Sequence, residues 1–494
     1  TWARGSTTGS EIQAIETHGT GTALGDPTEA GSLAASRGIQ DTKLSIGSAK
    51  ANIGHGEAPS GMSGLLKGCR LLTGGTMPGN AHLRVLNPLV NESMLSLRGA
   101  VVISSNGHSD SPTNPFGVSS FGFSGTIAHA LLRKSEAANA SLMHPPVRLT
   151  LQRKSFPWTD TYPWNSGTAT QPAATVRLIP AAVNPAVAGN TVELGTVMAI
   201  AESVIGGDVD ADVPLMAAGL DSLGAVELSE LLQKAAGGAD LPGTLVFDQP
   251  TARRLTSFLA NRGKARVAGP RGAGRMKDAV DVLILGLATQ IPGGAHAPKW
   301  AWQMMADGVD AIGMVPTSRW GMEAINAYGF PQSVVDRVKH GGFVRRAEYF
   351  DNRFFSISPA EASSMDPQQR LLLERGYETL AESGLKKADL DGNGTGVFIG
   401  IQALDFQDIL RASPAGQGVF AATGCNLAVS SGRISYVLGL QGPCASYDTA
   451  CSASLVGNHA NARALQRLEC EAALSAGVNM VLDPAVMRGN SIAG

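Results

Sequence analysis

The segment Asp448-Thr-Ala-Cys-Ser-Ala-Ser-Leu455 places a cysteine among small residues, just before a helix predicted over 455–468. A helix N-terminus favours negative charge and therefore favours the thiolate form of a nearby thiol. Small neighbours leave room for a substrate, so Cys451 is a candidate nucleophile. The alternative is a buried structural cysteine, which is the commoner role of this residue type. The other four cysteines lack this setting and are predicted to be structural: Cys69, Cys425, Cys444 and Cys470.

Two histidines lie in glycine-rich segments, Glu16-Thr-His-Gly-Thr-Gly-Thr22 and Ser48-Ala-Lys-Ala-Asn-Ile-Gly-His-Gly-Glu57. Glycine beside an imidazole lets backbone or ligand approach it closely, and Lys50 would supply a fixed positive charge near His55. His18 and His55 are therefore candidate site residues, although a single histidine is more often a hydrogen-bonded loop residue. The other seven histidines show no metal-ligand spacing, so no metal is expected.

An acidic helical bundle is predicted between residues 187 and 262, where ten acidic and four basic residues give a local charge of -6. Apolar residues recur on one helical face between 194 and 205, and two further helices are predicted over 223–231 and 255–259. Thr251 is the expected N-cap of the last helix. Ser222, in Gly219-Leu-Asp-Ser-Leu223, is either an N-cap or a site for a phosphate-linked group, because helix N-termini stabilise phosphate.

The composition describes a folded, multidomain protein. Its 494 residues correspond to roughly three to four domains, and 43% apolar with 16% charged residues argues against extensive disorder. A net charge of -2 argues against a nucleic-acid partner, and no apolar run is long enough to predict a membrane span. Five dispersed cysteines without a C-x-x-C pair favour a reducing, cytoplasmic location.

Two breaks divide the chain. Residues 136–186 are proline-rich and predict a linker with an ordered aromatic patch, and residues 263–279 predict a flexible basic linker. The patch comprises Phe156, Trp158, Tyr162 and Trp164. The flanking regions, 1–135 and 280–494, are predicted to be mixed α/β domains. In the second of these, 280–286 and 396–400 are typical of buried strands, and 370–380 and 455–468 of helices.

Taken together, these segments resemble motifs of modular type I polyketide synthases. Segments similar to the β-ketoacyl synthase are Glu16-Thr-His-Gly-Thr-Gly-Thr22, Ser48-Ala-Lys-Ala-Asn-Ile-Gly-His55, Ser120-Phe-Gly-Phe-Ser-Gly-Thr126, Pro316-Thr-Ser-Arg-Trp320, Met365-Asp-Pro-Gln-Gln-Arg-Leu-Leu-Leu-Glu374 and Asp448-Thr-Ala-Cys-Ser452. Gly219-Leu-Asp-Ser-Leu223 and Phe247-Asp-Gln-Pro-Thr251 resemble an acyl carrier protein. The resemblance implies an α/β fold in which thiolase-like ketosynthase halves flank a small all-α helical-bundle carrier domain.

The order of the motifs differs from that of the family, in which the cysteine segment precedes both histidine segments. Here His18 and His55 come first and Cys451 comes last. The chain therefore resembles the C-terminal part of one synthase (1–135, the tail half), a carrier domain (187–262), and the N-terminal part of the next synthase (280–494, the head half). A circular permutation is the competing explanation, but it would separate Cys451 from His18 by fewer residues than in the family. We expect the two halves to belong to different active sites, and the isolated chain to be inactive in condensation.

The resemblance implies polyketide chain elongation by decarboxylative Claisen condensation. Cys451 would accept the growing acyl chain as a thioester. His18 and His55 would stabilise charge on the carbonyl of a malonyl-type extender, and Lys50 would orient and tune them. Backbone N–H groups of Cys451 and Phe123 would form the oxyanion hole.

The same resemblance implies a cofactor and partners. Ser222 would carry covalent 4'-phosphopantetheine, whose thiol holds acyl and malonyl-type thioesters. The sequence contains no G-x-S-x-G elbow or strand-associated G-x-G-x-x-G motif, so extender loading is expected from a separate acyltransferase. A phosphopantetheinyl transferase and neighbouring synthase modules are the other expected partners. By family analogy, the full-length protein is expected to be a homodimer.

Some residues depart from the family pattern. Ser124-Gly-Thr-Ile127 stands where the family has Gly-Gly-Thr-Asn, and Gly56 and Pro59 replace commoner residues after His55. One alternative is therefore a carrier and docking segment with inactive ketosynthase flanks. Another is part of a fatty acid or polyunsaturated fatty acid synthase, which the same motifs would serve.

Overall fold

The computed structural model divides the chain into two compact units, residues 1–170 with 275–492, and residues 171–274. In the first unit it describes residues 11–22, 25–37, 43–81, 83–94, 101–103, 115–122, 125–135, 146–158, 281–402 and 405–493. In the second it describes 193–205, 251–261 and short stretches between them. Most of the two predicted linkers lies outside the described residues, and the predicted domain boundaries stay predictions.

The tail half contains a five-stranded sheet with the strand order β3-β2-β1-β4-β5. Its strands are β1 (Ala14–Glu16), β2 (Leu44–Gly47), β3 (Val101–Ile103), β4 (Phe116–Phe121) and β5 (Ile127–Leu132). Only β5 runs antiparallel to its neighbour. The helices of this half are α1 (Gly25–Arg37), α2 (Lys50–Ile53), α3 (Ser60–Leu72) and α4 (Pro88–Ser93).

The head half contains a three-stranded parallel sheet with the order β11-β10-β12. It is formed by β10 (Gly396–Ile401), β11 (Cys444–Tyr447) and β12 (Ala473–Val478). Every residue of β10 is buried, as its continuous apolar run predicts. Its main helices are α13 (Pro367–Glu382), α16 (Leu427–Leu438) and α17 (Ala453–Gln466), so both helices predicted in this half are confirmed.

Smaller elements complete the head half. They are η5 (Pro292–Gly294), α9 (Pro298–Ala306), β7 (Gly313–Met314), α10 (Met322–Ala327), α11 (Gln332–Val338), β8 (His340–Gly341), β9 (Tyr349–Phe350), α12 (Pro359–Ser364), η6 (Lys387–Asp389), α14 (Asp405–Ala412), η7 (Pro414–Gln417), α15 (Ala421–Gly424) and α18 (Pro484–Ala493). No helix in the described ranges is long and apolar enough to cross a membrane.

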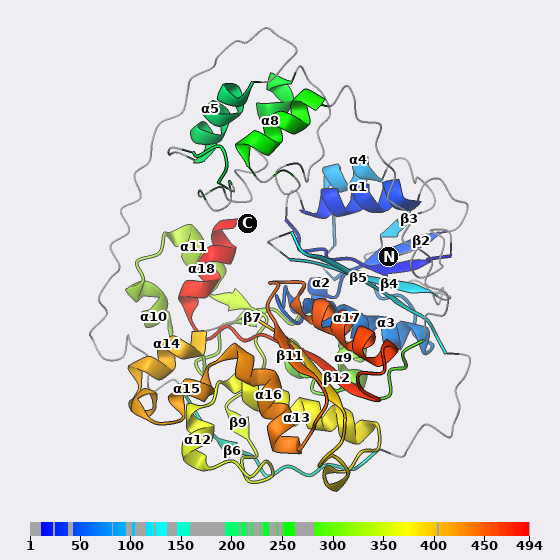
Figure 1. Cartoon of the computed structure of the whole chain (residues 1–494), viewed down its shortest axis with the longest axis vertical. Helices are drawn as coiled ribbons and strands as arrows, with labels where there is room; N and C mark the ends of the chain where they lie inside the picture. Colours follow the sequence, from blue (N-terminus) through cyan, green and yellow to red (C-terminus); the bar gives the residue numbers. More distant parts are fainter. Residues whose placement is uncertain are drawn as a thin grey trace. The chain divides into compact units, whose positions relative to one another are not determined.

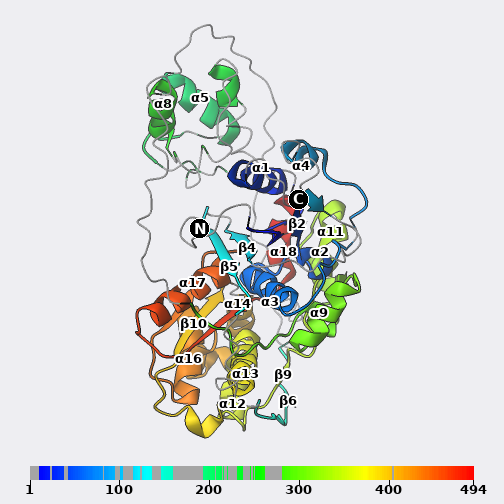
Figure 2. The ribbon, with the colours of Figure 1, turned by 90° about the vertical axis from the view of Figure 1, so that its right-hand side faces the viewer.

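The two halves share one layered core. Figures 1 and 2 show α1 and α4 over one sheet, α3 and α17 between the two sheets, and α13 and α16 beyond the second sheet. Leu455 of α17 belongs to the same apolar cluster as Phe116 and Val118 of the tail half. Gly61 of α3 faces Leu455 so closely that a Cβ would collide with its side chain. The central helix layer therefore contains one helix from each half.

A strap formed by residues 146–158 connects the tail half to the surface of the head half. Its strand β6 (Lys154–Ser155) pairs with β9, and Arg153 Nε lies 2.8 Å from Glu374 Oε2. Phe156 and Trp158 are buried against the head half, so this part of the predicted aromatic patch is confirmed. Tyr162 and Trp164 lie outside the described residues.

The second unit contains two long described helices, α5 (Leu194–Ile205) and α8 (Ala252–Asn261). They pack in a shared apolar cluster that includes Val197, Leu228 and Leu255. Thr251 Oγ1 accepts the backbone N–H of Arg254 at 3.3 Å, which confirms the predicted cap. Of the predicted middle helix, residues 223–227 lie outside the described residues, as does Ser222.

The predicted strand over 280–286 is wrong. Residues 281–286 pair with no described strand, and the side chains of 282–285 are 38–48% exposed. The nearest anchor is the backbone N–H of Leu287, which donates to Glu382 Oε2 at 3.3 Å. An apolar run becomes a strand only where a neighbour accepts its ladder of hydrogen bonds, and none of the described strands does so here.

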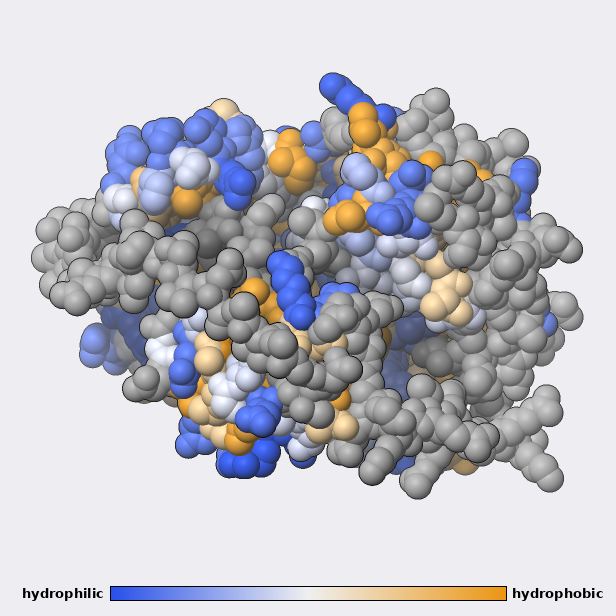
Figure 3. Space-filling view, turned by 90° about the horizontal axis from the view of Figure 1, so that it is seen from above, coloured by the Kyte–Doolittle hydropathy of each residue, from blue (hydrophilic) through white to orange (hydrophobic). Residues whose placement is uncertain are grey.

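Elsewhere on the surface, hydrophilic and hydrophobic residues are interspersed on the face drawn in Figure 3.

Candidate active site

Cys451 lies in the tight turn between β11 and α17. The preceding residue, Ala450, has φ 52°, a left-handed conformation that side chains other than glycine rarely adopt. Asp448 Oδ1 accepts the backbone N–H of Ala450 at 3.1 Å and so stabilises this turn. Strained backbone of this kind is common where a reactive group must be presented in one direction. The cysteine comes two residues before α17, close to the helix start predicted from the sequence.

The two candidate histidines come from the tail half and lie beside this cysteine. Nε2 of His55 is 3.0 Å from Sγ of Cys451, across 396 positions of the chain. The ring of His18 lies edge-on to that of His55, with 5.4 Å between the centroids. His18 follows the end of β1, and His55 follows α2, so the ends of two tail-half elements converge on the helix start of the head half.

Head-half backbone also holds the helix that precedes His55. Asn52 in α2 accepts the backbone N–H of Ala311 at 2.8 Å, and its Nδ2 donates to the carbonyl of Val309 at 3.1 Å. A Cβ at Gly342 would collide with the backbone oxygen of Ile53. The position of His55 therefore depends on packing between the two halves.

The environment keeps both imidazoles neutral. Burial, assisted by the charge of Lys50, lowers the pKa of His55 to about 3. Burial lowers the pKa of His18 to about 3 as well, with smaller effects from Lys50 and His55. The pKa of Lys50 is itself lowered by burial, while the charges of nearby acids oppose that shift. Neutral imidazole can donate one N–H to a substrate carbonyl, which is the chemistry expected of this pair.

Two buried carboxylates fix the backbone on which the site is built. Glu29 Oε1 accepts the N–H of His18 at 2.8 Å, and its Oε2 accepts that of Gly19 at 3.0 Å. Glu16 Oε2 lies 2.6 Å from Lys67 Nζ, and Glu16 Oε1 accepts the N–H of Ala49. Neither carboxylate was singled out by the sequence analysis, because each partner lies at least ten positions away.

The expectation that the two halves come from successive synthases with separate active sites stays a prediction, and within this chain the structure brings their site residues together. Cys451, His18, His55 and Lys50 lie in one unit and share one site. The reversed order does not prevent this, because closing a long intervening segment costs entropy that grows only slowly with its length. Phe123 lies outside the described residues, so its predicted role in the oxyanion hole stays a prediction.

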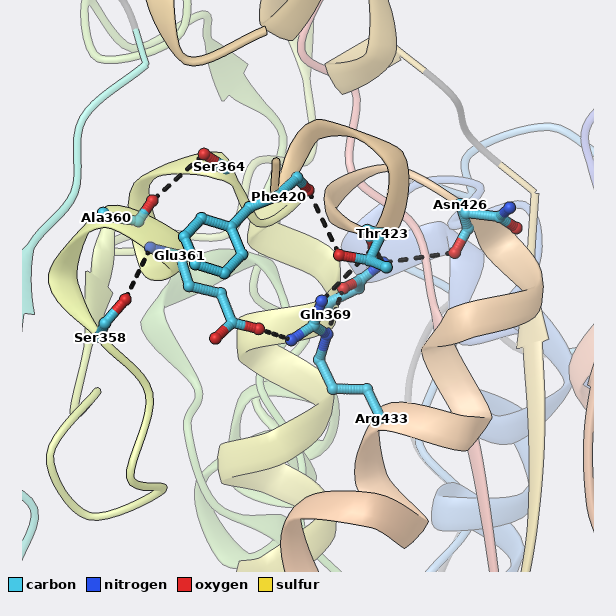
Figure 4. Close-up of polar contacts among 9 residues, drawn as sticks. All are labelled: Ser358, Ala360, Glu361, Ser364, Gln369, Phe420, Thr423, Asn426 and Arg433. Atoms are coloured by element: carbon cyan, nitrogen blue, oxygen red, sulfur yellow. Dashed lines mark hydrogen bonds and ion pairs between the residues drawn. The ribbon is translucent and has the colours of Figure 1, made fainter. Parts of the chain in front are cut away.

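The head half has a separate cavity of about 520 Å³, lined in part by Gln407, Arg411, Cys425 and Asn426. Neither Cys451 nor the two histidines is among its described lining residues. Figure 4 shows Arg433 and Gln369 beside the segment that contains Asn426, one of the lining residues.

Arg433 is 8% exposed and links three helices to residues 423–426, which comprise the end of α15 and the two residues after it. Its guanidinium pairs with Glu361, and its Nε donates to Gln369 Oε1 at 2.8 Å. Gln369 Nε2 in turn donates to the carbonyls of Thr423 at 3.2 Å and Asn426 at 3.3 Å (Figure 4). This network links residues 423–426 to α12, α13 and α16, and no site residue predicted from the sequence belongs to it.

No group of three or more histidine, cysteine, aspartate or glutamate residues in the described ranges could hold a metal ion. Ser222 lies outside the described residues, so its role as the attachment residue of a phosphopantetheine arm stays a prediction. Leu220 is buried in the apolar cluster of the second unit, and its N–H donates to the carbonyl of Leu215 at 2.9 Å. The chain is therefore anchored to the bundle core two residues before Ser222.

Three family matches follow the chain in order. The C-terminal domain of β-ketoacyl synthases matches residues 2–84, a phosphopantetheine attachment site matches 195–259, and the N-terminal domain of β-ketoacyl synthases matches 279–494. The fold and site thus define a β-ketoacyl synthase linked to an acyl carrier. The matched attachment site indicates that 4'-phosphopantetheine is covalently bound to the carrier.

Known relatives narrow this class. Polyketide synthase GfsB of Streptomyces halstedii is 41% identical over 271 residues, which are 54% of this chain and 5% of that protein. The pikromycin polyketide synthase component PikAII of Streptomyces venezuelae is 41% identical over 270 residues, 54% of this chain and 7% of that protein. The chain belongs to the modular polyketide synthases, and it spans less than a tenth of the length of either relative.

A solved ketosynthase is also similar. The ketosynthase from module 6 of the bacillaene synthase of Bacillus subtilis 168 is 33% identical, with a TM-score of 0.36. The alignment covers 43% of this chain and 34% of that one.

Proposed function

We propose that this chain elongates a polyketide by decarboxylative Claisen condensation, at one site that its tail and head halves build together. The observation that carries the proposal is the 3.0 Å contact between His55 Nε2 and Cys451 Sγ. A nucleophile and a neutral ring nitrogen within hydrogen-bond distance are the geometry of nucleophilic acyl transfer. The expectation of an inactive chain stays a prediction, because it rests on separate half-sites, whereas this proposal rests on one site formed by both halves.

In the acylation step, the sulfur of Cys451 attacks the carbonyl of an acyl thioester and the carrier thiol leaves. The backbone N–H groups of Cys451 and Phe123 are the proposed donors to the oxygen that becomes negatively charged. Thiolate suits this step because it is both a strong nucleophile and a tolerable leaving group.

In the condensation step, a malonyl-type thioester loses carbon dioxide, and the resulting carbanion attacks the acyl group on Cys451. His18 and His55 donate N–H groups to the extender carbonyl, where negative charge develops. Their low pKa values keep them neutral at pH 7, so they act as hydrogen-bond donors rather than as cations. Lys50 lies close enough to affect the pKa of both imidazoles, and it is the residue proposed to tune them.

The carrier unit is proposed to deliver both substrates, with Ser222 as the attachment residue. The terminal thiol of bound 4'-phosphopantetheine holds the acyl group as a thioester. A phosphopantetheinyl transferase and a separate acyltransferase are the proposed loading partners, and neighbouring synthase modules the donors and acceptors of the chain. We further propose a homodimeric full-length protein, and a cytoplasmic location in which its five free cysteines stay reduced.

The test is a condensation assay with the purified, phosphopantetheinylated chain, an acyl thioester and a malonyl-loaded carrier. We expect a β-ketoacyl product from the wild type and none from Cys451→Ala. Cys444→Ala is the matched control, because Cys444 is an exposed cysteine of the same half. If Ser222 is modified but Cys451 neither acylates nor condenses, the chain is a carrier and docking segment instead.

A further inference from the structure

The carbonyl oxygen of Cys451 is held by two serine hydroxyls. Ser120 Oγ donates to it at 2.6 Å and Ser60 Oγ at 2.9 Å. Both serines belong to the tail half, Ser120 at the end region of β4 and Ser60 at the first position of α3. They are 0% and 6% exposed, so water does not replace either hydroxyl readily. Two serines of the tail half therefore bind the backbone carbonyl of the nucleophile, which belongs to the head half.

The proton count allows both hydroxyls to bond this oxygen at the same time. The two Oγ atoms lie 3.3 Å apart, and each serine has a single hydroxyl proton. If both protons point at the Cys451 carbonyl, no proton is left for a bond between the serines. A carbonyl oxygen has two lone pairs, so it can accept both bonds at once.

The surrounding contacts leave Ser60 little freedom to move. The N–H of Ser454 donates to the carbonyl of Ala58 at 3.1 Å, and Ser454 Oγ accepts the N–H of Met62 at 3.3 Å. These two bonds join the start of α3 to the start of α17 on either side of Ser60. Leu455 closes the contact against Gly61, where a Cβ would not fit.

We propose that Ser60 is a positioning residue for Cys451, which acts with Ser120 by holding the cysteine carbonyl so that Sγ stays directed at His55. The turn it braces contains Ala450 in a left-handed conformation, and such a turn relaxes unless its surroundings hold it. The inference rests on the proposed function for its catalytic consequence. The two hydrogen bonds to the Cys451 carbonyl affect the reactivity of Cys451 whether or not the proposed function holds.

The experiment compares Ser60→Ala, Ser60→Thr and the control Ser63→Ala in the full chain. Ser63 lies on the same helix, but its hydroxyl donates within the helix, to Pro59. The first readout is the rate at which iodoacetamide alkylates Cys451, followed by peptide mass spectrometry. The second is kcat and KM for acylation by an acyl thioester, and thermal unfolding is recorded for each variant.

We expect Ser60→Ala to slow alkylation of Cys451 and to lower kcat for acylation, each roughly three- to tenfold, the equivalent of one lost hydrogen bond. KM and the unfolding midpoint should stay near the wild-type values, Ser60→Thr should restore the rates, and Ser63→Ala should not change them. Unchanged alkylation in Ser60→Ala overturns the proposal. So does a rate loss that follows a lowered unfolding midpoint, or one that threonine does not restore. A wild-type chain that alkylates but never acylates refutes the proposed function alone, and the alkylation rates still decide the role of Ser60.

Discussion

Both carboxylate oxygens of Glu29 are bonded to backbone at the site, Oε1 to the N–H of His18 at 2.8 Å and Oε2 to that of Gly19 at 3.0 Å. The same burial that makes this pairing effective raises the pKa of Glu29 to about 7. The group that holds His18 in place therefore gains a proton near neutral pH, whereas the imidazole it holds does not.

This relationship predicts an acid limb in the pH profile of extender decarboxylation. As pH falls through about 7, Glu29 becomes protonated, loses part of its acceptor capacity, and holds His18 less firmly. The rate should fall across that range. His18 and His55 do not explain such a limb, since their pKa values are about 3. Glu29→Gln should give a low rate that no longer varies between pH 6 and pH 8, measured as release of carbon dioxide.

The free energy of unfolding of Glu29→Gln, relative to the wild type, should change with pH in one direction. The pKa of Glu29 is raised from its ordinary value of 4.5, so the folded protein binds this proton more tightly than the unfolded chain does. Stability from this group therefore falls as pH rises from about 4.5 to about 7. Urea unfolding of Glu29→Gln relative to wild type should show a difference that shifts in favour of the variant over this range. A difference independent of pH would contradict the raised pKa.

Lys67→Met should destabilise the protein strongly. Lys67 and Glu16 form an ion pair whose side chains are only 3% and 4% exposed, so the variant leaves a buried carboxylate without its cation. Removing one partner of a buried pair costs about 3–5 kcal/mol, measured as the free energy of unfolding in urea. Lys339→Met is the matched control, because its partner Asp336 is largely exposed. That control should unfold like the wild type, and equal losses in both variants would contradict the role of burial.

Gly342→Ala should weaken the packing of the head half against α2. The added methyl group would meet the backbone oxygen of Ile53, which cannot rotate away as a side chain could. Overpacking of this kind costs about 1–3 kcal/mol. Because Ile53 precedes His55 by two positions, alkylation of Cys451 should slow as well. Gly394→Ala is the control, since a Cβ built there meets no atom of the described residues within 4 Å, its chain neighbours aside.

Ser222→Ala should abolish attachment of 4'-phosphopantetheine. Incubation with coenzyme A and a phosphopantetheinyl transferase should add one arm to the wild type, seen as a mass increase, and none to the variant. Ser203→Ala is a suitable control, because Ser203 lies on α5 and its exposed hydroxyl donates to Ile200 of the same helix. An arm that attaches to Ser222→Ala would place the site elsewhere on the carrier.

The sequence identifies the groups that perform chemistry better than it identifies what holds them. Cys451, His18 and His55 stand out because small residues and glycines surround them within a few positions. Ser60 and Ser120 do not stand out, since their shared partner is 391 and 331 positions away. Whether such residues meet depends on the packing of α3 against α17, which no local pattern encodes.

The prediction of strands from the sequence has the same limit. The apolar run at 396–401 becomes β10 because β11 and β12 pair with it on both sides. The equally apolar run at 282–285 stays partly exposed and unpaired with any described strand. Composition alone does not distinguish these two segments, since the difference lies in their neighbours.

The strap at residues 146–158 determines where the connection to the carrier begins. Because β6 is paired with β9 and Trp158 is buried, the covalent connection toward the carrier starts after Trp158, not at the end of β5. The connecting segment between the strap and the carrier therefore has fewer residues. A shorter connection raises the effective concentration at which its two ends meet. Inserting residues after Trp158 would therefore lengthen the connection to the carrier while leaving the pairing of β6 with β9 unchanged.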